Sequence, residues 1–383
     1  MATHWGMGGI LKFAPAGLLL MAALALPSVA RAETRGYVVS WFHMAAYSED
    51  GDCPDGLNPS ADAMFVKILK GMGKTQPEID ALMEGFPNGK ELRPVVMNRG
   101  KIDGKPVNVY QNPLSEPDPR ISTVKGHFAY GFNLDGKVGP DDFTDPETGE
   151  TGVDNQLVRA LGCFHTERAK PPGRPTYPFI QWDMTRDQMP AWVIQIAGIE
   201  RGPDGAVKDG DVTISIDRAT GPITRNAAGD PQSDMTFQVG PNPRWHNSAP
   251  ATIRNGVLTT TATFAFNMGD DPFAVTEYNI KDTRLRLHIN PDGTLKGIMG
   301  GYQPWRPIYV SFGLAGSTNE FNLSVDVPGI FYALRRLADA YPDPITGQNT
   351  AISSAFVIEA VPAFVLNQTP AKTADAGAGR HAY

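Results

Sequence analysis

The segment RLRLHINPDGTL (residues 284–295) decides the fold class of this chain, because it combines a strand with a turn. Its first six residues alternate between basic and apolar side chains, which is the two-residue period of a strand with one buried face. The inward face holds Leu285, Leu287 and Ile289, and the outer face holds Arg284, Arg286 and His288. Residues 290–293 (NPDG) are typical turn residues, so we expect a hairpin that leads into a second strand.

Further short runs of strand-forming residues, separated by Gly, Pro, Asn and Asp, extend from about residue 178 to residue 366. The clearest are 212–216, 236–239, 258–266, 284–289 and 308–312, and a last run at 355–366 closes the region. Strands of this kind bury an apolar face only by packing sheet on sheet or by closing on themselves. We predict a mainly β (α+β) fold, with a β-sandwich-like domain over residues 176–366.

The preceding part of the chain, residues 33–175, is predicted to be a mixed region of helices and loops joined to that domain. It begins with a strand at 37–42 and contains helices at 60–72, 77–84 and 152–163, each indicated by apolar residues at helical spacing. Residues 85–119 show no sustained period, so we expect extended loops with one strand at 107–110. One late helix is predicted at 330–341, and residues 367–383 are expected to fray.

The first 32 residues have the pattern of a secretory signal peptide. A basic residue, Lys12, precedes the apolar run 13–25, and Ala30-Arg31-Ala32 forms a small-residue cleavage site before Glu33. We therefore predict a periplasmic or secreted protein, with no membrane insertion after cleavage. The formal net charge of −7 argues against a nucleic-acid or anionic-membrane binder, which needs a basic surface.

The chain has two cysteines, Cys53 and Cys163, and in an oxidising compartment a disulfide between them is expected. Closure of a loop of about 110 residues stabilises a fold by about 4–5 kcal/mol at most. The alternative interpretation takes Cys163 and His165, spaced as C-x-H, as metal ligands together with His43.

An acidic loop that contains glycines is the strongest candidate for a ligand site. The segment GFNLDGKVGPDD (residues 131–142) resembles the calcium loops of EF-hand and dockerin proteins, with oxygen donors around a sharp-turn glycine. It departs from that pattern at Gly131, where the first ligand is usually Asp, and at Pro140, where a helix should begin. The alternative is a solvated acidic loop whose Gly, Asp and Asn residues make turns. The predicted Ca²⁺ ligands are Asn133, Asp135, Asp141, Asp142, Asp145 and Asp154.

Two further groups are candidate ligand-binding residues. The basic stripe of the 284–289 strand suits an acidic sugar or a carboxylate, and its alternative is a solvated strand face. Aromatic rings beside polar donors suit the stacking of sugar rings, and their alternative is core packing. The stripe is Arg284, Arg286 and His288, and the aromatic group is Trp245, His246, Tyr302 and Trp305.

No motif in the sequence identifies a catalytic centre. The G-x-S-x-G elbow and the H-E-x-x-H zinc helix are absent, and residues 122–125 match S-x-x-K without its companion K-T-G. Carboxylates near predicted strands are expected to be solvated, and these are Glu200, Asp217, Glu277 and Glu320.

We therefore expect an exported, non-catalytic binding or structural protein that is stabilised by calcium and contacts carbohydrate. One alternative is a secreted polysaccharide hydrolase or lyase, which would place paired carboxylates in a cleft of the sandwich. Another is a periplasmic partner of a redox or uptake system, suggested by Met and His residues around residues 41–44.

Overall fold

The computed structural model describes residues 32–168, 175, 190–269 and 277–367. Nearly all of the predicted signal peptide (1–32) and of the predicted tail (367–383) lies outside the described residues, and so does residue 176, at the predicted domain boundary. Within the described part of the chain, no helix is both long enough and apolar enough to cross a membrane.

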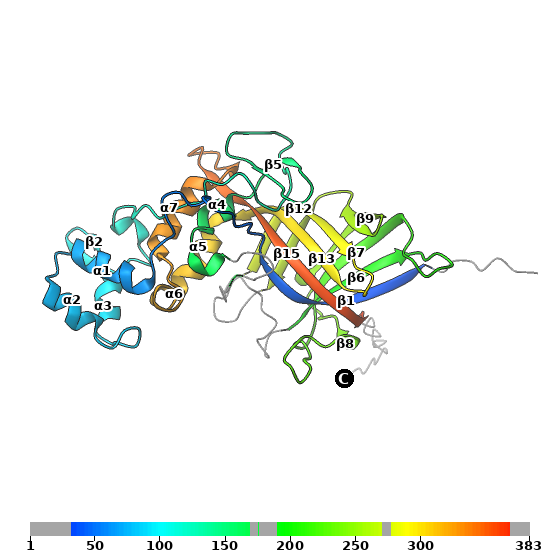
Figure 1. Ribbon diagram of the computed structural model, residues 1–383, viewed down its shortest axis with the longest axis horizontal. Helices are drawn as coiled ribbons and strands as arrows, with labels where there is room; N and C mark the ends of the chain where they lie inside the picture. The colour runs from blue at the N-terminus through cyan, green and yellow to red at the C-terminus, as the bar shows by residue number, and fades with distance from the viewer. Residues whose placement is uncertain (1–31, 169–174, 176–189, 270–276, 368–383) are drawn as a thin grey trace, which may run out of the picture. The chain divides into compact units, whose positions relative to one another are not determined.

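Eight antiparallel strands form one sheet that closes on itself as a barrel (Figure 1). In order around the barrel they are β1 (Glu33–Met44), β6 (Trp192–Ile199), β7 (Gly210–Arg218), β9 (His246–Arg254), β10 (Val257–Thr260), β12 (Glu277–Ile289), β13 (Leu295–Pro304) and β15 (Asn349–Leu366). The sheet closes where β1 pairs with β15, with Val38 opposite Val361 and Phe42 opposite Ile358. The β-rich fold is confirmed, whereas the predicted sandwich is not, because the strands form the wall of one closed sheet instead of two layers.

The pairing of β1 explains why the sandwich prediction differs from the barrel. Alternating strands are compatible with either arrangement, since both bury one face of each strand. The strand that closes the sheet comes from the N-terminal part of the chain, where β1 pairs on one side with β15 and on the other with β6. No local pattern in the sequence shows that this strand joins others more than 150 residues away.

Shorter strands extend the barrel sheet or lie beside it. β11 (Phe264–Gly269) pairs with β12, β14 (Ala340–Pro342) pairs with one end of β15, and β8 (Met235–Gln238) runs parallel to the other end. Two small hairpins are separate from the barrel sheet: β2 (Gly100–Ile102) with β3 (Lys105–Val107), and β4 (Phe143–Thr144) with β5 (Thr151–Val153).

The predicted hairpin at 284–295 is confirmed. β12 and β13 flank the turn at 290–293, where Gly293 has a φ of +86° and Asn290 donates its backbone N–H to the carbonyl of Thr294 at 2.9 Å. Leu285 and Leu287 are fully buried, whereas the basic residues of the same strand lie on the outer face of the barrel.

The interior of the barrel is packed with aromatic rings. Phe42 of β1 lies 5.2 Å from Tyr278 of β12 and 4.7 Å from Phe356 of β15, measured between ring centroids. Because β13 and β15 separate β1 from β12 in the sheet, the contact between Phe42 and Tyr278 crosses the interior. Trp192 of β6 contacts Phe42 from the other side at 5.0 Å. These edge-on and stacked rings supply both buried area and specific geometry to the core.

Seven helices lie in the described part of the chain (Figure 1). They are α1 (Ala61–Gly71), α2 (Gln76–Met83), α3 (Leu92–Met97), α4 (Gln156–Leu161), α5 (Trp305–Leu314), α6 (Gly316–Leu323) and α7 (Val327–Leu337), with short 3₁₀ turns at η1 (Pro113–Ser115), η2 (His165–Glu167) and η3 (Pro243–Trp245). The helices predicted at 60–72, 77–84, 152–163 and 330–341 correspond to α1, α2, α4 and α7. Helices α3 and α6 were not predicted.

Three predicted strands differ from the structure. The strand expected at 107–110 is a turn, because β3 ends at Val107. Residues 308–312 belong to helix α5, because Trp305, Tyr309 and Phe312 are buried at helical spacing on one face. The aromatic and β-branched composition of this run is typical of a strand, and its helical period is visible only when Trp305 is included. The predicted strand at 258–266 divides into β10 and β11, which both pair with β12.

Helices α1 to α3 form a second, smaller core around α6. The ring of Phe65 from α1 lies 4.3 Å from that of Phe321 from α6, and the guanidinium of Arg93 from α3 lies 4.4 Å from the centre of the Phe321 ring. The predicted disulfide is present, and it joins Cys53 to Cys163 with their Cα atoms 6.0 Å apart. The bridge links the segment that leads to α1 with the end of α4.

Candidate functional site

The acidic loop and the basic stripe, predicted as separate ligand sites, bind each other on the outer wall of the barrel. Arg286 Nη2 lies 2.7 Å from Asp145 Oδ2, and Arg286 Nη1 lies 3.3 Å from Glu150 Oε2. Burial opposes ionisation of Asp145, but two backbone N–H donors and the charge of Arg286 outweigh it, so the pKa of Asp145 lies below its usual range. The arginine therefore supplies the positive charge that the loop requires.

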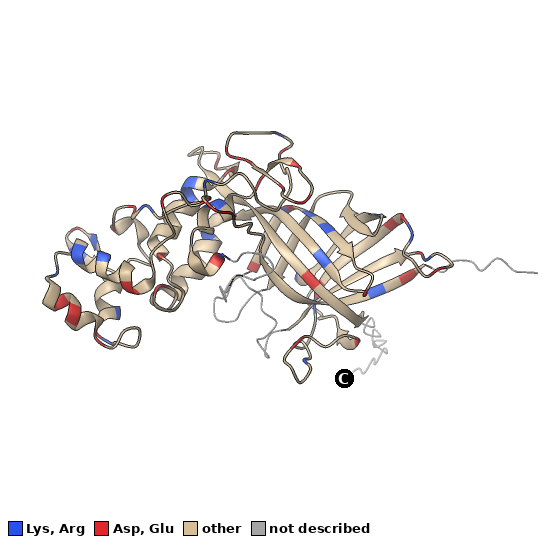
Figure 2. Ribbon diagram, in the orientation of Figure 1, with Lys and Arg blue, Asp and Glu red and all other residues tan. Residues whose placement is uncertain are grey.

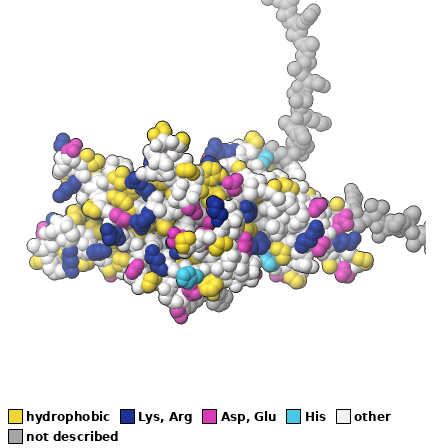
Figure 3. Space-filling view, turned by 90° about the horizontal axis from the view of Figure 1, so that it is seen from above, with side chains coloured by type: hydrophobic (Ala, Val, Ile, Leu, Met, Phe, Trp, Pro, Cys, Tyr) yellow, Lys and Arg dark blue, Asp and Glu magenta, His cyan; other side chains and the backbone are white. Residues whose placement is uncertain are grey.

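The other two members of the stripe also face the loop. Arg284 donates from its two terminal nitrogens to the carbonyls of Asn133 and Leu134, at 2.8 and 3.1 Å. His288 Nε2 lies 3.9 Å from Glu147 Oε1, in a pair that is exposed to solvent. The stripe thus holds the loop against β12, and its two arginines are occupied by the chain itself. Figure 2 shows basic and acidic residues interspersed over the barrel strands, and Figure 3 shows both signs mixed on one face of the molecule.

Most of the remaining predicted calcium ligands accept hydrogen bonds from the backbone of the loop itself. Asp154 Oδ2 accepts the backbone N–H of Leu134 at 2.7 Å and of Asp135 at 3.3 Å. Backbone N–H groups also donate to the side chains of three other predicted ligands: Gly136 to Asn133, Lys137 to Asp135 and Gly139 to Asp142. Asp141 accepts a hydrogen bond from Arg159 at its backbone carbonyl. Among the described residues, no group of three or more His, Cys, Asp or Glu side chains is placed to hold a metal ion.

Asp154 is the carboxylate with the most unfavourable surroundings in this loop. Burial, together with the negative charges of Asp135 and Asp142, raises its pKa to about 6 despite the two backbone donors. A bound cation would relieve this repulsion, so calcium binding by the loop stays a prediction.

The predicted aromatic platform is divided between two places. Tyr302 and Trp305 are 9% and 3% exposed, and Trp305 packs edge-on against Phe331 with its Nε1 donating to the carbonyl of Asn349 at 3.2 Å. Trp245 lies in η3, half-buried beneath Arg218 and Arg244. The following His246 is exposed and bonds the carbonyl of Gly240 at 2.9 Å. Core packing accounts for the rings of Tyr302 and Trp305.

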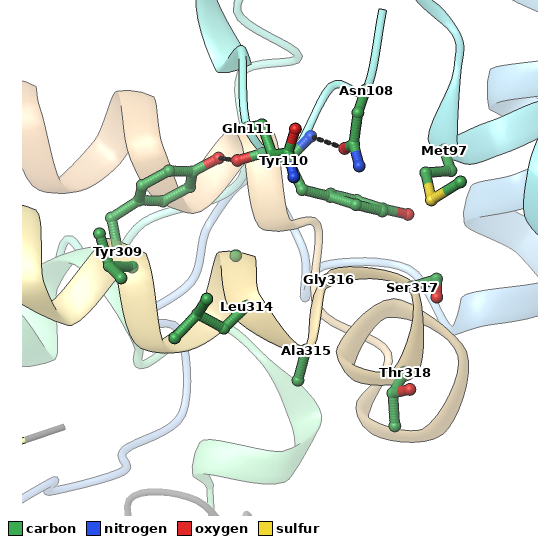
Figure 4. A pocket seen from close by; sticks show the side chains of 12 residues that line it. Met97, Asn108, Tyr110, Gln111, Tyr309, Leu314, Ala315, Gly316, Ser317 and Thr318 are labelled. Atoms are coloured by element: carbon green, nitrogen blue, oxygen red, sulfur yellow. Dashed lines mark hydrogen bonds between the residues drawn. The ribbon is translucent and has the colours of Figure 1, made fainter. Parts of the chain in front are cut away.

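A groove of about 450 Å³ lies between residues 108–111 and the junction of α5 with α6 (Figure 4). We call it the α5–α6 groove. Its apolar lining includes Val310 and Leu314, which are 48% and 62% exposed. Its polar lining includes the amides of Asn108 and Gln111 on one segment and the hydroxyls of Ser317 and Thr318 on α6. None of the lining residues, all of which are described, carries a formal charge.

Tyr110 forms the floor of the groove and is held from several directions. A Cβ atom added at Gly316 would come within 2.3 Å of the Tyr110 ring, so only glycine allows this ring to rest on the start of α6. Tyr309 donates its hydroxyl to the carbonyl of Tyr110 at 2.6 Å, and Asn108 Oδ1 accepts the Tyr110 N–H at 2.9 Å. Figure 4 shows the ring extending from the 108–111 segment over α6.

A buried charge network lies beneath Tyr110. Its hydroxyl donates to Glu320 Oε2 at 2.6 Å, and Arg99 donates to both oxygens of the same carboxylate, at 3.1 and 3.3 Å. Arg99 also bonds Glu116 at 3.0 Å. The side chains of Arg99 and Glu320 are 3% and 0% exposed, so this pair is removed from water and must remain complete.

The network holds three carboxylates against one guanidinium, because Asp326 lies close to Glu320. Burial and the charge of Glu320 raise the pKa of Asp326 to about 6. Burial raises the pKa of Glu116, and burial together with Glu320 raises the pKa of Tyr110, which keeps its hydroxyl protonated as a donor. Since Glu320 accepts from Arg99, Tyr110 and the backbone of Val327, its lone pairs are occupied and its role is to position Tyr110.

This site was not predicted from the sequence. Glu320 was expected to be solvated, but it is fully buried, and Asp217 is also buried at 7% exposure. Glu200 is exposed, as expected, whereas Glu277 is half-buried and forms an ion pair with Arg244. Helix α6 (GSTNEFNL) has no apolar period, and residues 85–119 show no sustained period. The helical spacing of Trp305, Tyr309 and Phe312 was the one signal that could have placed a helix beside the groove.

A second buried pair connects η2 with β1. His43 Nδ1 donates to the carbonyl of Met44 at 2.7 Å, and its Nε2 lies 3.4 Å from Glu167 Oε2. Burial raises the pKa of Glu167. The alternative metal site at Cys163 and His165 is wrong as a thiolate site, because Cys163 is bonded to Cys53.

Comparison of the chain with protein-family models, with curated proteins and with solved structures found no match.

Replacement of Arg286 by Met tests whether the arginine holds the acidic loop. We expect the variant to lose about 3 kcal/mol of unfolding free energy in urea, because it leaves the fully buried carboxylate of Asp145 without its cation. Arg254→Met, on an exposed residue of β9, should change stability by less than about 0.5 kcal/mol. Equal losses in the two variants would contradict the assignment.

Replacement of Asp326 by Asn tests the buried network through its pH dependence. In the wild type the folded-state pKa of about 6 exceeds the ordinary 3.8, so the stabilisation is present below pH 4 and is lost as pH rises through 6. Asn keeps the acceptor for the Gly329 N–H but does not ionise. The variant should therefore gain about 2 kcal/mol over wild type between pH 4 and pH 7.5.

Asp62→Asn is the control, because hydrogen bonds from Ser60 and the helix backbone lower the pKa of Asp62, so its contribution to stability changes below pH 4 and the variant should differ from wild type by a nearly constant amount between pH 4 and pH 7.5. A difference between Asp326→Asn and wild type that does not change with pH would show that Asp326 ionises normally.

Proposed function

We propose that this chain is an exported binding protein that holds a neutral, hydroxyl-rich ligand, such as a saccharide, in the α5–α6 groove. The observation that carries the proposal is the composition of the groove lining, which combines exposed apolar side chains with uncharged hydrogen-bonding groups. A pyranose has the same combination, since its ring C–H groups are apolar and its hydroxyls both donate and accept hydrogen bonds.

The uncharged lining argues for a neutral ligand over an ionic one. Amides and hydroxyls donate and accept together, which matches the hydroxyl groups of a sugar, whereas a charged ligand would lose its hydration without gaining a counter-charge. The volume of about 450 Å³ lies within the range of pockets that hold small molecules.

Binding is better supported than glycosidic chemistry at this groove. Hydrolysis or elimination would require one or two carboxylates beside the ligand, and the lining residues include none. The nearest carboxylate in the network is Glu320, which is covered by Tyr110 and already accepts bonds from that ring and from Arg99.

Export is supported by two observations that agree with each other. The first 32 residues have the pattern of a signal peptide, and the Cys53–Cys163 disulfide is compatible with an oxidising compartment. Calcium as a partner of the acidic loop is a separate proposal, and the arginines on β12 now account for part of the charge that motivated it.

The binding proposal is tested by calorimetric titration of the purified protein with a panel of neutral mono- and oligosaccharides. We expect at least one of them to bind, and the double variant Gln111→Ala/Thr318→Ala to weaken that binding about tenfold or more, since two hydrogen bonds are lost at about 1 kcal/mol each. Both side chains are exposed, so the fold should be unaffected.

Gln232→Ala/Thr259→Ala is the matched control, because it removes the same groups from exposed positions on other parts of the chain. Absence of heat with every saccharide, or equal weakening in the two double variants, would refute the proposal.

A further inference from the structure

A second pocket, of about 460 Å³, lies apart from the α5–α6 groove. Its walls are the segment 55–59, the segment 119–122 and one face of α1, and Phe164 and Asp326 also line it. We call it the α1 pocket. It has no residue in common with the lining of the α5–α6 groove.

The walls of the α1 pocket are fixed by specific bonds. Asn58, which is 4% exposed, donates to the carbonyl of Ser122 at 3.0 Å and accepts its N–H at 2.8 Å. The N–H of Asn58 bonds the carbonyl of Cys163 at 2.9 Å, so the wall also depends on the disulfide-linked segment. Two loops distant in the sequence are therefore held in one arrangement before any ligand enters.

The interior of the α1 pocket is mainly apolar. Leu57, Met64, Ile68, Ile121 and Phe164 line it, and Leu57 is 39% exposed at its mouth. An apolar group of a ligand would be removed from water here, at about 25 cal/mol for each Å² buried.

Charges of both signs accompany this apolar lining. Lys67 and Arg120 are exposed, and among the described residues neither has a carboxylate within salt-bridge distance. Arg120 is held in the left-handed backbone region at φ +55°, where its N–H bonds Asp118 Oδ1 at 2.8 Å. Asp55 and Asp326 supply the negative charges, and the carboxylate of Asp326 also accepts the N–H of Gly329 at 2.7 Å.

From this combination we infer that the α1 pocket binds an apolar zwitterion, namely an amino acid or a short peptide with a large apolar side chain and both termini free. Lys67 and Arg120 pair with the carboxylate of the ligand, Asp55 and Asp326 pair with its ammonium group, and the side chain occupies the space between Met64, Ile68 and Phe164. The site is independent of the saccharide proposal.

The balance of charges in the α1 pocket favours a zwitterion over an apolar anion, an apolar cation or an uncharged apolar ligand. A fatty-acid anion would meet two cations but would bring its carboxylate close to Asp55 and Asp326, and an alkyl amine would have the opposite conflict. A wholly apolar ligand would remove four charged side chains from water without pairing them. The zwitterion satisfies both signs at once.

Calorimetric titration with three related dipeptides tests the inference. The probes are Leu-Leu, N-acetyl-Leu-Leu, which lacks the ammonium group, and Leu-Leu amide, which lacks the carboxylate. We expect Leu-Leu to bind with one-to-one stoichiometry and each blocked form to bind at least tenfold more weakly. L-Leucine in the same titration separates a free amino acid from a peptide as the natural source. No heat with Leu-Leu and leucine up to 10 mM, or equal affinity for a blocked form, would overturn the inference.

Matched variants locate the binding in the α1 pocket. Lys67→Gln/Arg120→Gln should lower the affinity for Leu-Leu at least tenfold, whereas Lys70→Gln/Lys101→Gln, which removes two exposed cations outside the lining, should leave it unchanged. Leu57→Trp fills the mouth from a partly exposed position and should abolish binding while the melting temperature stays within a few degrees. The groove variant Gln111→Ala/Thr318→Ala should bind Leu-Leu normally. Equal behaviour of the two charge variants would overturn the inference.

Discussion

The buried ion pair between Arg99 and Glu320 is the constraint on which the functional part of this structure depends. It joins residues 221 positions apart, and it links the end of α3 to the middle of α6. Two ions removed from water are costly unless every donor and acceptor is used, and here Tyr110, Glu116 and the backbone of Val96 and Val327 complete the set. The position of Tyr110, and with it the floor of the α5–α6 groove, follows from this requirement.

The two charged features that stand out in the sequence serve mainly to assemble the molecule. Arg286 and Arg284 attach the acidic loop to the outside of the barrel, Arg286 through two carboxylates of the loop and Arg284 through two backbone carbonyls. Charged residues that suggest a ligand site in the sequence therefore bind other parts of the same chain in the structure. The candidate binding sites lie instead in segments of ordinary composition. The lining of the α5–α6 groove is uncharged, and the lining of the α1 pocket has charges of both signs, so neither site appears in the sequence as a run of like residues.

The sequence was sufficient for local structure and insufficient for long-range assembly. The alternation at 284–289, the turn at 290–293, helix α1 and the disulfide all follow from patterns within a few residues or from the presence of two cysteines. Closure of the barrel by β1 could not be predicted, since a sandwich and a barrel bury the same faces. The groove could not be predicted either, because α6 buries Glu320 by pairing it with Arg99 and has no apolar stripe of its own.

Amide hydrogen exchange of a Glu320→Gln variant tests most directly whether the buried charge pair holds the groove. Gln keeps the shape of Glu320 and an acceptor for Tyr110 but leaves Arg99 with only the less buried Glu116 as its counter-charge. We expect exchange in residues 108–112 and 316–323 to become at least tenfold faster, with protection of the barrel strands β1 and β15 unchanged, because local segments open independently of a stable core. Unchanged exchange in those two segments, or an equal loss of protection in the barrel strands, would contradict the central role given to this pair.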